Sequence, residues 1–185
     1  MGADRMNEAL VCFDLGDTLM IEDSENKDAD GVTQSADLIP GMAELVRSLR
    51  ERGVRLALVA DTRIGTYRNV LHQHGLFDLF DAFAISEELG VQKPHPAMFE
   101  HALHETGTEV GSGAALMVGN NYARDIVGAK ALGIDTLWFH WNERYPTPAD
   151  GDASAADGRV ASADELRAWI EAWLARPDAV GEASA

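Results

Sequence analysis

The chain has 185 residues and a formal net charge of −16 at pH 7. A chain of this length fits one domain that buries roughly two thirds of its unfolded surface. The negative charge disfavours a nucleic acid or an anionic membrane as a partner, because either would repel the protein at long range. The N-terminal stretch lacks the character of a signal peptide, and no apolar segment approaches the ~20 residues that span a bilayer, so we expect a cytoplasmic protein.

Five short apolar runs are the candidate strands, at residues 9–13, 56–60, 82–86, 115–119 and 136–139. They lack the alternation of polar and apolar residues found in a sheet with one solvent-exposed face, which favours strands covered on both sides. Helical patterns lie at residues 40–53, 65–75, 96–107 and 123–133. The alternation of strand and helix predicts an α/β fold, a three-layer Rossmann-like arrangement with a central parallel sheet and helices on both faces.

The C-terminal part is expected to close the domain with one more helix. Ser162 and Glu165 form a capping box at the start of an apolar stripe over residues 162–174. Residues 142–161 are rich in Pro, Asp, Gly and Ala and predict an exposed connection. We therefore expect a single domain over residues 1–176 and a frayed tail over 177–185.

Polar residues follow the ends of the predicted strands, where the functional crevice of a parallel sheet lies. These are residues 14–18, 61–63 and 120–125, while Lys93 follows a loop after the third strand. An aspartate at a strand end can attack phosphorus if a cation offsets the charge between it and the phosphate. Mg²⁺ with its oxygen ligands suits this task, and a lysine adds a compact positive charge.

These segments, in this order, resemble the haloacid dehalogenase-like hydrolase superfamily, most of whose members are Mg²⁺-dependent phosphatases. The resemblance covers about residues 10–141 and rests on "DLGDTL" from Asp14, on the Lys93–Pro94 pair and on "GNNYARDIVGAKALG". It implies that Asp14 is the nucleophile and that Lys93 offsets charge and contacts the phosphate. It also implies a Mg²⁺ ion held by Asp14, the carbonyl of Gly16, Asn120 and Asp125.

The first motif departs from the family at Gly16, where relatives carry the acid that protonates the leaving group. General acid catalysis of this kind is worth ~10²–10⁴-fold in rate. Asp17 is the candidate replacement, provided that the conformational range of Gly16 lets the loop aim the next side chain at the site.

Two further positions differ from the family pattern. Relatives place a phosphate-binding Ser or Thr at the end of the second strand, where this chain has Ala60, so Asp61 and Thr62 are the candidate phosphate ligands. The first acid of the last motif is Asn120, which can bind Mg²⁺ through its amide oxygen but carries no charge.

The segment between the first strand and the first helix is too short for a cap domain. Residues 20–38 are expected to form a small flap, and the acids between Glu22 and Asp30 a solvated part of it. Relatives without a cap tend to use large substrates or to cover the site with a neighbouring subunit, so a homo-oligomer is one expectation.

The sequence predicts a Mg²⁺-dependent phosphohydrolase acting on a phosphorylated substrate of unknown identity. One alternative is a catalytically impaired phosphate-binding or interaction protein, suggested by Gly16, Ala60 and Asn120. Another is a haloacid dehalogenase, which needs neither the second acid nor a metal. Simpler roles are also open: Asp14 as a turn residue, Lys93 as a surface cation, and Asp125 as a helix cap.

Overall fold

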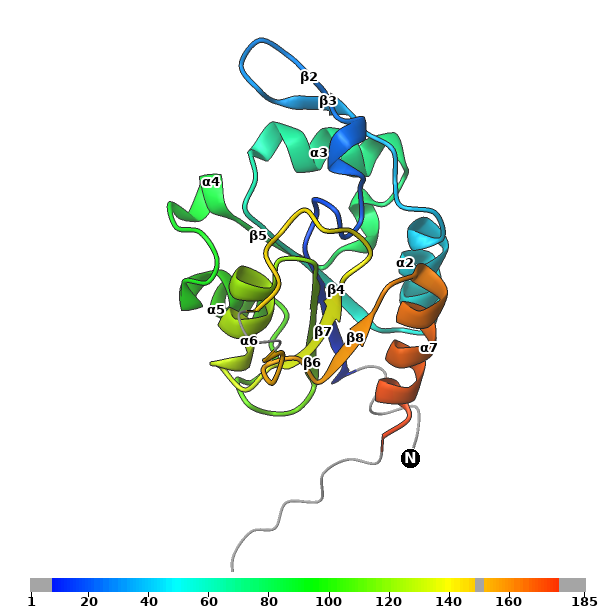
Figure 1. Cartoon of the computed structure of the whole chain (residues 1–185), viewed down its shortest axis with the longest axis vertical. Coiled ribbons are helices and arrows are strands. Elements are labelled where there is room, and N and C mark those ends of the chain that lie inside the picture. Colours follow the sequence, from blue (N-terminus) through cyan, green and yellow to red (C-terminus); the bar gives the residue numbers. More distant parts are fainter. Residues whose placement is uncertain (1–7, 149–151, 177–185) are drawn as a thin grey trace, which may run out of the picture.

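A computed structural model describes residues 8–148 and 152–176. Its centre is a six-stranded parallel sheet with strand order β5-β4-β1-β6-β7-β8 (Figure 1). The strands are β1 (Leu10–Phe13), β4 (Arg55–Ala60), β5 (Ala82–Ile85), β6 (Ala115–Gly119), β7 (Asp135–Phe139) and β8 (Gly158–Val160). The five expected strands and the α/β Rossmann-like fold are therefore confirmed.

Helices cover both faces of this sheet. The helices are α2 (Met42–Glu51), α3 (Ile64–Gln73), α4 (Ser86–Leu89), α5 (Pro96–Glu105), α6 (Val127–Lys130) and α7 (Ala163–Leu174). Shorter turns are the 3₁₀ segments η1 (Glu22–Ser24) and η2 (Phe77–Leu79) and the π-helical turn η3 (Tyr122–Ile126), which leads directly into α6. Apolar side chains of α2, α3 and α7 pack in one core, and those of α5 and α6 pack in another.

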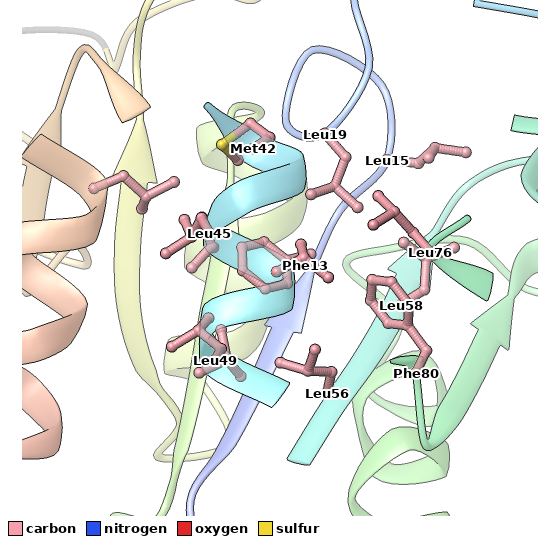
Figure 2. Packing of buried hydrophobic residues seen from close by; sticks show 14 of the residues in the cluster. Phe13, Leu15, Leu19, Met42, Leu45, Leu49, Leu56, Leu58, Leu76 and Phe80 are labelled. Carbon is pink, nitrogen blue, oxygen red and sulfur yellow. The ribbon is translucent and has the colours of Figure 1, made fainter. Parts of the chain in front are cut away.

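Successive residues of the central strands contribute to opposite cores. Val11 and Phe13 of β1 belong to the core under α2 and α7, whereas Leu10 and Cys12 belong to the core under α5. Figure 2 shows the first core, where Phe13 lies among the side chains of α2 and the neighbouring strands. Burial on both faces explains why these strands are continuous apolar runs.

The helix ends follow the predicted signals with one difference. α7 begins after Ser162, whose Oγ accepts a hydrogen bond of 3.2 Å from the main-chain N–H of Glu165, as expected for a cap. α2 begins at Met42, after Gly41 in a left-handed conformation with φ 89°, so Pro40 lies before the helix rather than in its first turn.

The flap over residues 20–38 contains an antiparallel hairpin of β2 (Asn26–Lys27) and β3 (Thr33–Ser35). The hairpin stands beside α3 at the top of Figure 1. Side chains of α3 hold it there: Thr66 Oγ1 accepts a bond of 3.0 Å from the N–H of Thr33, and Asn69 donates one of 2.9 Å to the Thr33 carbonyl. These bonds fix the flap over the carboxyl end of the sheet.

The segment over residues 142–161 was expected to be wholly an exposed connection, and this is wrong at its end. Gly158–Val160 forms β8, which pairs in parallel with β7. A three-residue strand is too short to produce a periodic pattern. Residues 149–151 of this segment and the tail at 177–185 lie outside the described residues. Across 8–148 and 152–176, no helix has the length and apolarity needed to cross a membrane.

Candidate active site at the carboxyl edge of the sheet

A cavity of about 740 Å³ lies at the carboxyl ends of β1, β4 and β6. Its lining combines residues from the strand ends with residues from the flap and from the segment after β7. The expected site residues that line it are Asp14, Gly16, Asp61, Thr62, Lys93 and Asp125. Topology brings them together because the ends of neighbouring parallel strands meet at one edge.

Asp14 directly follows β1 and extends that strand's pairing by one step. Its main-chain N–H donates a bond of 3.0 Å to the carbonyl of Val118 in β6, which fixes the backbone. Its side chain is 13% exposed and faces the cavity. Oδ1 accepts from Lys93 at 2.8 Å, while within the described part of the chain Oδ2 has only a long contact of 3.4 Å with the hydroxyl of Thr18. Oδ2 is thus the less engaged oxygen of the carboxylate.

Lys93 lies at the centre of a buried charge cluster. Its ammonium nitrogen lies 2.8 Å from Oδ1 of Asp14, 2.7 Å from Oδ1 of Asp125 and 2.7 Å from the carbonyl of Val59. Burial alone would lower the pKa of Lys93, but the carboxylates of Asp125 and Asp14 raise it above its ordinary value. Because an ammonium has three protons, these three oxygens account for all of them, and the group stays charged.

Asp125 is fully buried and lies in the π-helical turn η3, just before α6. Its second oxygen accepts a bond of 2.9 Å from the main-chain N–H of Asn121. Burial raises the pKa of Asp125, and the positive charge of Lys93 opposes this shift. The side chain therefore does more than cap a helix, because it forms half of an ion pair in the cavity wall.

The two candidate phosphate ligands after β4 differ in what they offer. Oδ1 of Asp61 accepts a bond of 2.8 Å from the main-chain N–H of Lys93, and Oδ2 lies 3.2 Å from Nη1 of Arg124. The carboxylate is thus committed to the protein. Thr62 lines the cavity, as does Ala60, which has no hydroxyl.

The side chain of Asp17 does not line the cavity. It is fully buried, its backbone has φ 49°, and the left-handed conformation turns the carboxylate toward the segment after β7. There it accepts bonds from the N–H of Glu22 at 3.0 Å, from Asn142 at 2.9 Å and from Nε of Arg144. The loop therefore does not aim Asp17 at the nucleophile, which the role of general acid would require.

Glu22 is a cavity residue that sequence reasoning missed, because it opens a run of acids that favours a solvated flap. It is half-buried, and its Oε1 accepts a bond of 3.1 Å from the hydroxyl of Tyr145. Burial and the carboxylate of Asp17 raise the pKa of Glu22. The one signal in its favour is its place directly after the apolar residues Met20 and Ile21.

The donors available for a metal are all oxygens, as Mg²⁺ prefers. Asp14, Gly16 and Asp125 line the cavity and offer two carboxylates and a carbonyl, whereas the expected ligand Asn120, which offers an amide, does not line it. Among the described residues, neither side-chain polar atom of the buried Asn120 has a hydrogen-bond partner, so a cation would satisfy its oxygen. The residues thus fit Mg²⁺ in kind, although no group of three His, Cys, Asp or Glu is gathered as a metal cluster within 8–148 and 152–176.

Comparisons with known proteins agree with this arrangement. The chain is 36% identical over 106 residues to the glyceraldehyde 3-phosphate phosphatase of Pyrococcus abyssi, covering 57% of this chain and 43% of that protein. It is 31% identical over 114 residues to the haloacetate dehalogenase H-2 of Moraxella sp., covering 59% of this chain and 50% of that protein. The chain spans about half the length of the curated relatives it matches.

The fold also matches solved structures. A crystal structure of an HAD phosphatase from Thermococcus onnurineus superimposes with a TM-score of 0.71 and 19% identity, covering 88% of this chain and 97% of that chain. At this identity the likeness shows the fold. A family model described as haloacid dehalogenase-like hydrolase matches residues 30–133, more than half of the sequence. The chain therefore belongs to the haloacid dehalogenase-like hydrolases, a family whose members similar to this chain include phosphatases.

Proposed function

We propose that the chain is a Mg²⁺-dependent phosphohydrolase that acts through an aspartyl-phosphate on Asp14. The observation that carries the proposal is the cluster in which Lys93 joins Asp14 and Asp125 at the cavity wall. The ammonium fixes Oδ1 of Asp14 and leaves Oδ2 as the oxygen that attacks phosphorus. The substrate class is a phosphorylated molecule whose phosphoryl group enters the cavity.

The residues of the cavity divide the work as follows. Asp14 forms the bond to phosphorus, and Lys93, itself held by Asp125, keeps the carboxylate of Asp14 in place. Asp14, Gly16, Asn120 and Asp125 would hold Mg²⁺, which would supply positive charge between the nucleophile and the phosphoryl oxygens. The hydroxyl and main chain of Thr62 contact the phosphate. We propose that Asp61 holds Lys93 in position, because the carboxylate of Asp61 accepts a hydrogen bond from the main-chain N–H of Lys93.

The test is the hydrolysis of p-nitrophenyl phosphate in the presence of Mg²⁺ by the wild type and by Asp14→Asn. We expect the variant to lose nearly all turnover and EDTA to abolish the activity of the wild type. Acid quenching during turnover should trap a phosphoryl group on the peptide that contains Asp14. Asp78→Asn, at an exposed position in η2, is the matched control and should retain activity. Equal rates for the wild type and Asp14→Asn would reject the nucleophile.

Ala60 and Asn120 support a second candidate, a phosphate-binding protein with little turnover. Ala60 lacks the hydroxyl that would bind phosphate more tightly. Asn120 lacks the negative charge that would bind a metal more tightly. Calorimetric binding of phosphate with Mg²⁺, without hydrolysis of any phosphate ester, would favour this candidate. Release of halide from chloroacetate without metal would instead favour a dehalogenase, in line with the name of the Moraxella relative.

A further inference from the structure

The carboxyl group of Glu22 fills the space that Gly16 leaves open beside the nucleophile. A Cβ atom built on Gly16 would overlap Oε1 of Glu22 and would lie 3.0 Å from its Cδ. Gly16 is two residues from Asp14, and all three residues line the cavity. A carboxyl group carried by the flap therefore stands where a side chain at position 16 would begin.

Other acidic side chains of the cavity are held by partners that keep them from a leaving group. Asp61 and Asp125 are engaged by the contacts described above. Glu25 forms an ion pair of 2.8 Å within the flap. Glu87 accepts a hydrogen bond of 2.7 Å from the main-chain N–H of the first residue of α3. Oε1 of Glu22 accepts from the neutral hydroxyl of Tyr145, and its Oε2 lies 3.5 Å from Nε of Arg144, an ion pair longer than that of Glu25. Glu22 also lies next to the loop that carries the nucleophile.

We propose that Glu22 is the general acid and general base of this hydrolysis, an inference that rests on the proposed phosphohydrolase function. In the first step Asp14 forms a bond to phosphorus, the bond from phosphorus to the leaving oxygen breaks, and the carboxyl group of Glu22 gives its proton to that oxygen. In the second step the carboxylate of Glu22 takes a proton from water, whose oxygen attacks the aspartyl-phosphate. The bond from phosphorus to Asp14 then breaks, which releases phosphate and restores both side chains.

Contacts from the loop after β1 and from the segment after β7 hold Glu22 in this place. Its main-chain N–H donates to Asp17, which is itself bound by the segment after β7. Its Oε1 accepts from Tyr145, which belongs to that segment. Asp17 and Tyr145 are thus positioning residues for Glu22. Tyr145→Phe should impair the same step as a change at Glu22, by a smaller factor.

The first experiment compares two substrates of similar shape, phenyl phosphate and p-nitrophenyl phosphate, with Mg²⁺. Phenolate is the poorer leaving group and depends more on a proton donor. We expect Glu22→Gln to slow phenyl phosphate hydrolysis roughly 10²-fold and p-nitrophenyl phosphate hydrolysis less than ~10-fold. Glu25→Gln, another flap acid in the cavity, should change both rates by the same factor. Equal factors for Glu22→Gln would overturn the inference.

A second experiment places a carboxyl group at position 16, where relatives carry their acid. Gly16→Asp alone should be impaired, because the new side chain would collide with Glu22. The double variant Gly16→Asp/Glu22→Ala removes the collision, and we expect it to hydrolyse phenyl phosphate at least ~10-fold faster than Glu22→Ala. A double variant that folds, by circular dichroism, but gains nothing over Glu22→Ala would count against the inference.

The outcomes separate this inference from the function on which it rests. If Asp14→Asn matches the wild type, the nucleophile is wrong and both proposals fail. If Asp14→Asn is inactive while Glu22→Gln slows both substrates equally, the phosphohydrolase stands and Glu22 is not its acid and base.

Discussion

The ammonium nitrogen of Lys93 lies 2.8 Å from Oδ1 of Asp14, although the two residues are 79 positions apart in the chain. The side chain of Lys93 is 2% exposed, and the same ammonium pairs with the fully buried Asp125. Removing this cation would leave two carboxylates in a poorly solvated place without the positive charge that pairs with them. The cluster is therefore a structural element as well as a part of the site.

Lys93→Met should lower the free energy of unfolding at pH 7 by ~3–5 kcal/mol, because a buried ion pair is costly to break from one side. Urea unfolding followed by circular dichroism measures this. Lys27→Met is the matched control, since Lys27 pairs with Glu25 at 2.8 Å but is 50% exposed. We expect a loss of ~0.2–1 kcal/mol there. Losses of equal size in the two variants would contradict the buried cluster.

The central sheet could be predicted because its signals are local. Each of the five expected strands is a continuous apolar run, and these runs are buried on both faces in the structure except at Phe83 of β5, which is partly buried. The strand-end rule then placed Asp14, Lys93 and Asp125 around one cavity without any knowledge of distances. The elements that escaped prediction are short, such as β8 with three residues and α4 with four.

The finer geometry of the site depends on contacts that leave no local pattern. The sequence shows that Gly16 has no side chain, but it does not show that Glu22 fills the space. Arg144 and Tyr145 lie in a segment whose composition predicts an exposed connection, yet they bind residues more than 120 positions earlier. The side chain of Asp17 turns away from the cavity because Asn142 and Arg144 hold its carboxylate. Such pairings become visible only when the loops are placed in space.

Arg144→Leu should lower the free energy of unfolding by ~1.5–3 kcal/mol, since it removes a charged hydrogen bond from the fully buried Asp17. In the background of Asp17→Asn the same change should cost much less, because the buried group is then neutral. The double-mutant cycle measures the coupling between the two residues by urea unfolding. Additive effects would show that the contact does not stabilise the loop.

Gly119→Ala should destabilise the protein although Gly119 lies in the extended backbone of β6. At a compatible position this substitution usually stabilises by ~0.4–1 kcal/mol. Here the new Cβ would overlap Oδ2 of Asp125 and lie 2.5 Å from its Cγ, so the buried carboxylate would have to move. We expect a loss of ~1–3 kcal/mol and reduced turnover, measured by thermal unfolding and by phosphate ester hydrolysis. A more stable Gly119→Ala variant would contradict the packing.

Asp157 connects the segment before β8 to α6 and β7 through its side chain. Its Oδ1 lies 2.6 Å from the ammonium of Lys130, and Oδ2 accepts a bond of 2.9 Å from the N–H of Thr136. Burial alone would raise the pKa of Asp157, but the bonds from Lys130 and Thr136 outweigh it and lower the pKa below its ordinary value of 3.8. The charged form is thus favoured in the folded state.

A lowered pKa in the folded state means that Asp157 adds stability above pH 3.8 and that this stability is lost as the pH falls through the folded-state pKa. Asp157→Asn should therefore cost about 1 kcal/mol at neutral pH, a value reduced by the partial exposure of the side chain. The difference from the wild type should shrink in urea unfolding measured below pH 3.8. Asp78→Asn, exposed in η2, should leave the free energy of unfolding unchanged at neutral pH. A difference for Asp157→Asn that stays constant from neutral to acid pH would show that the stabilisation does not come from the charge of Asp157.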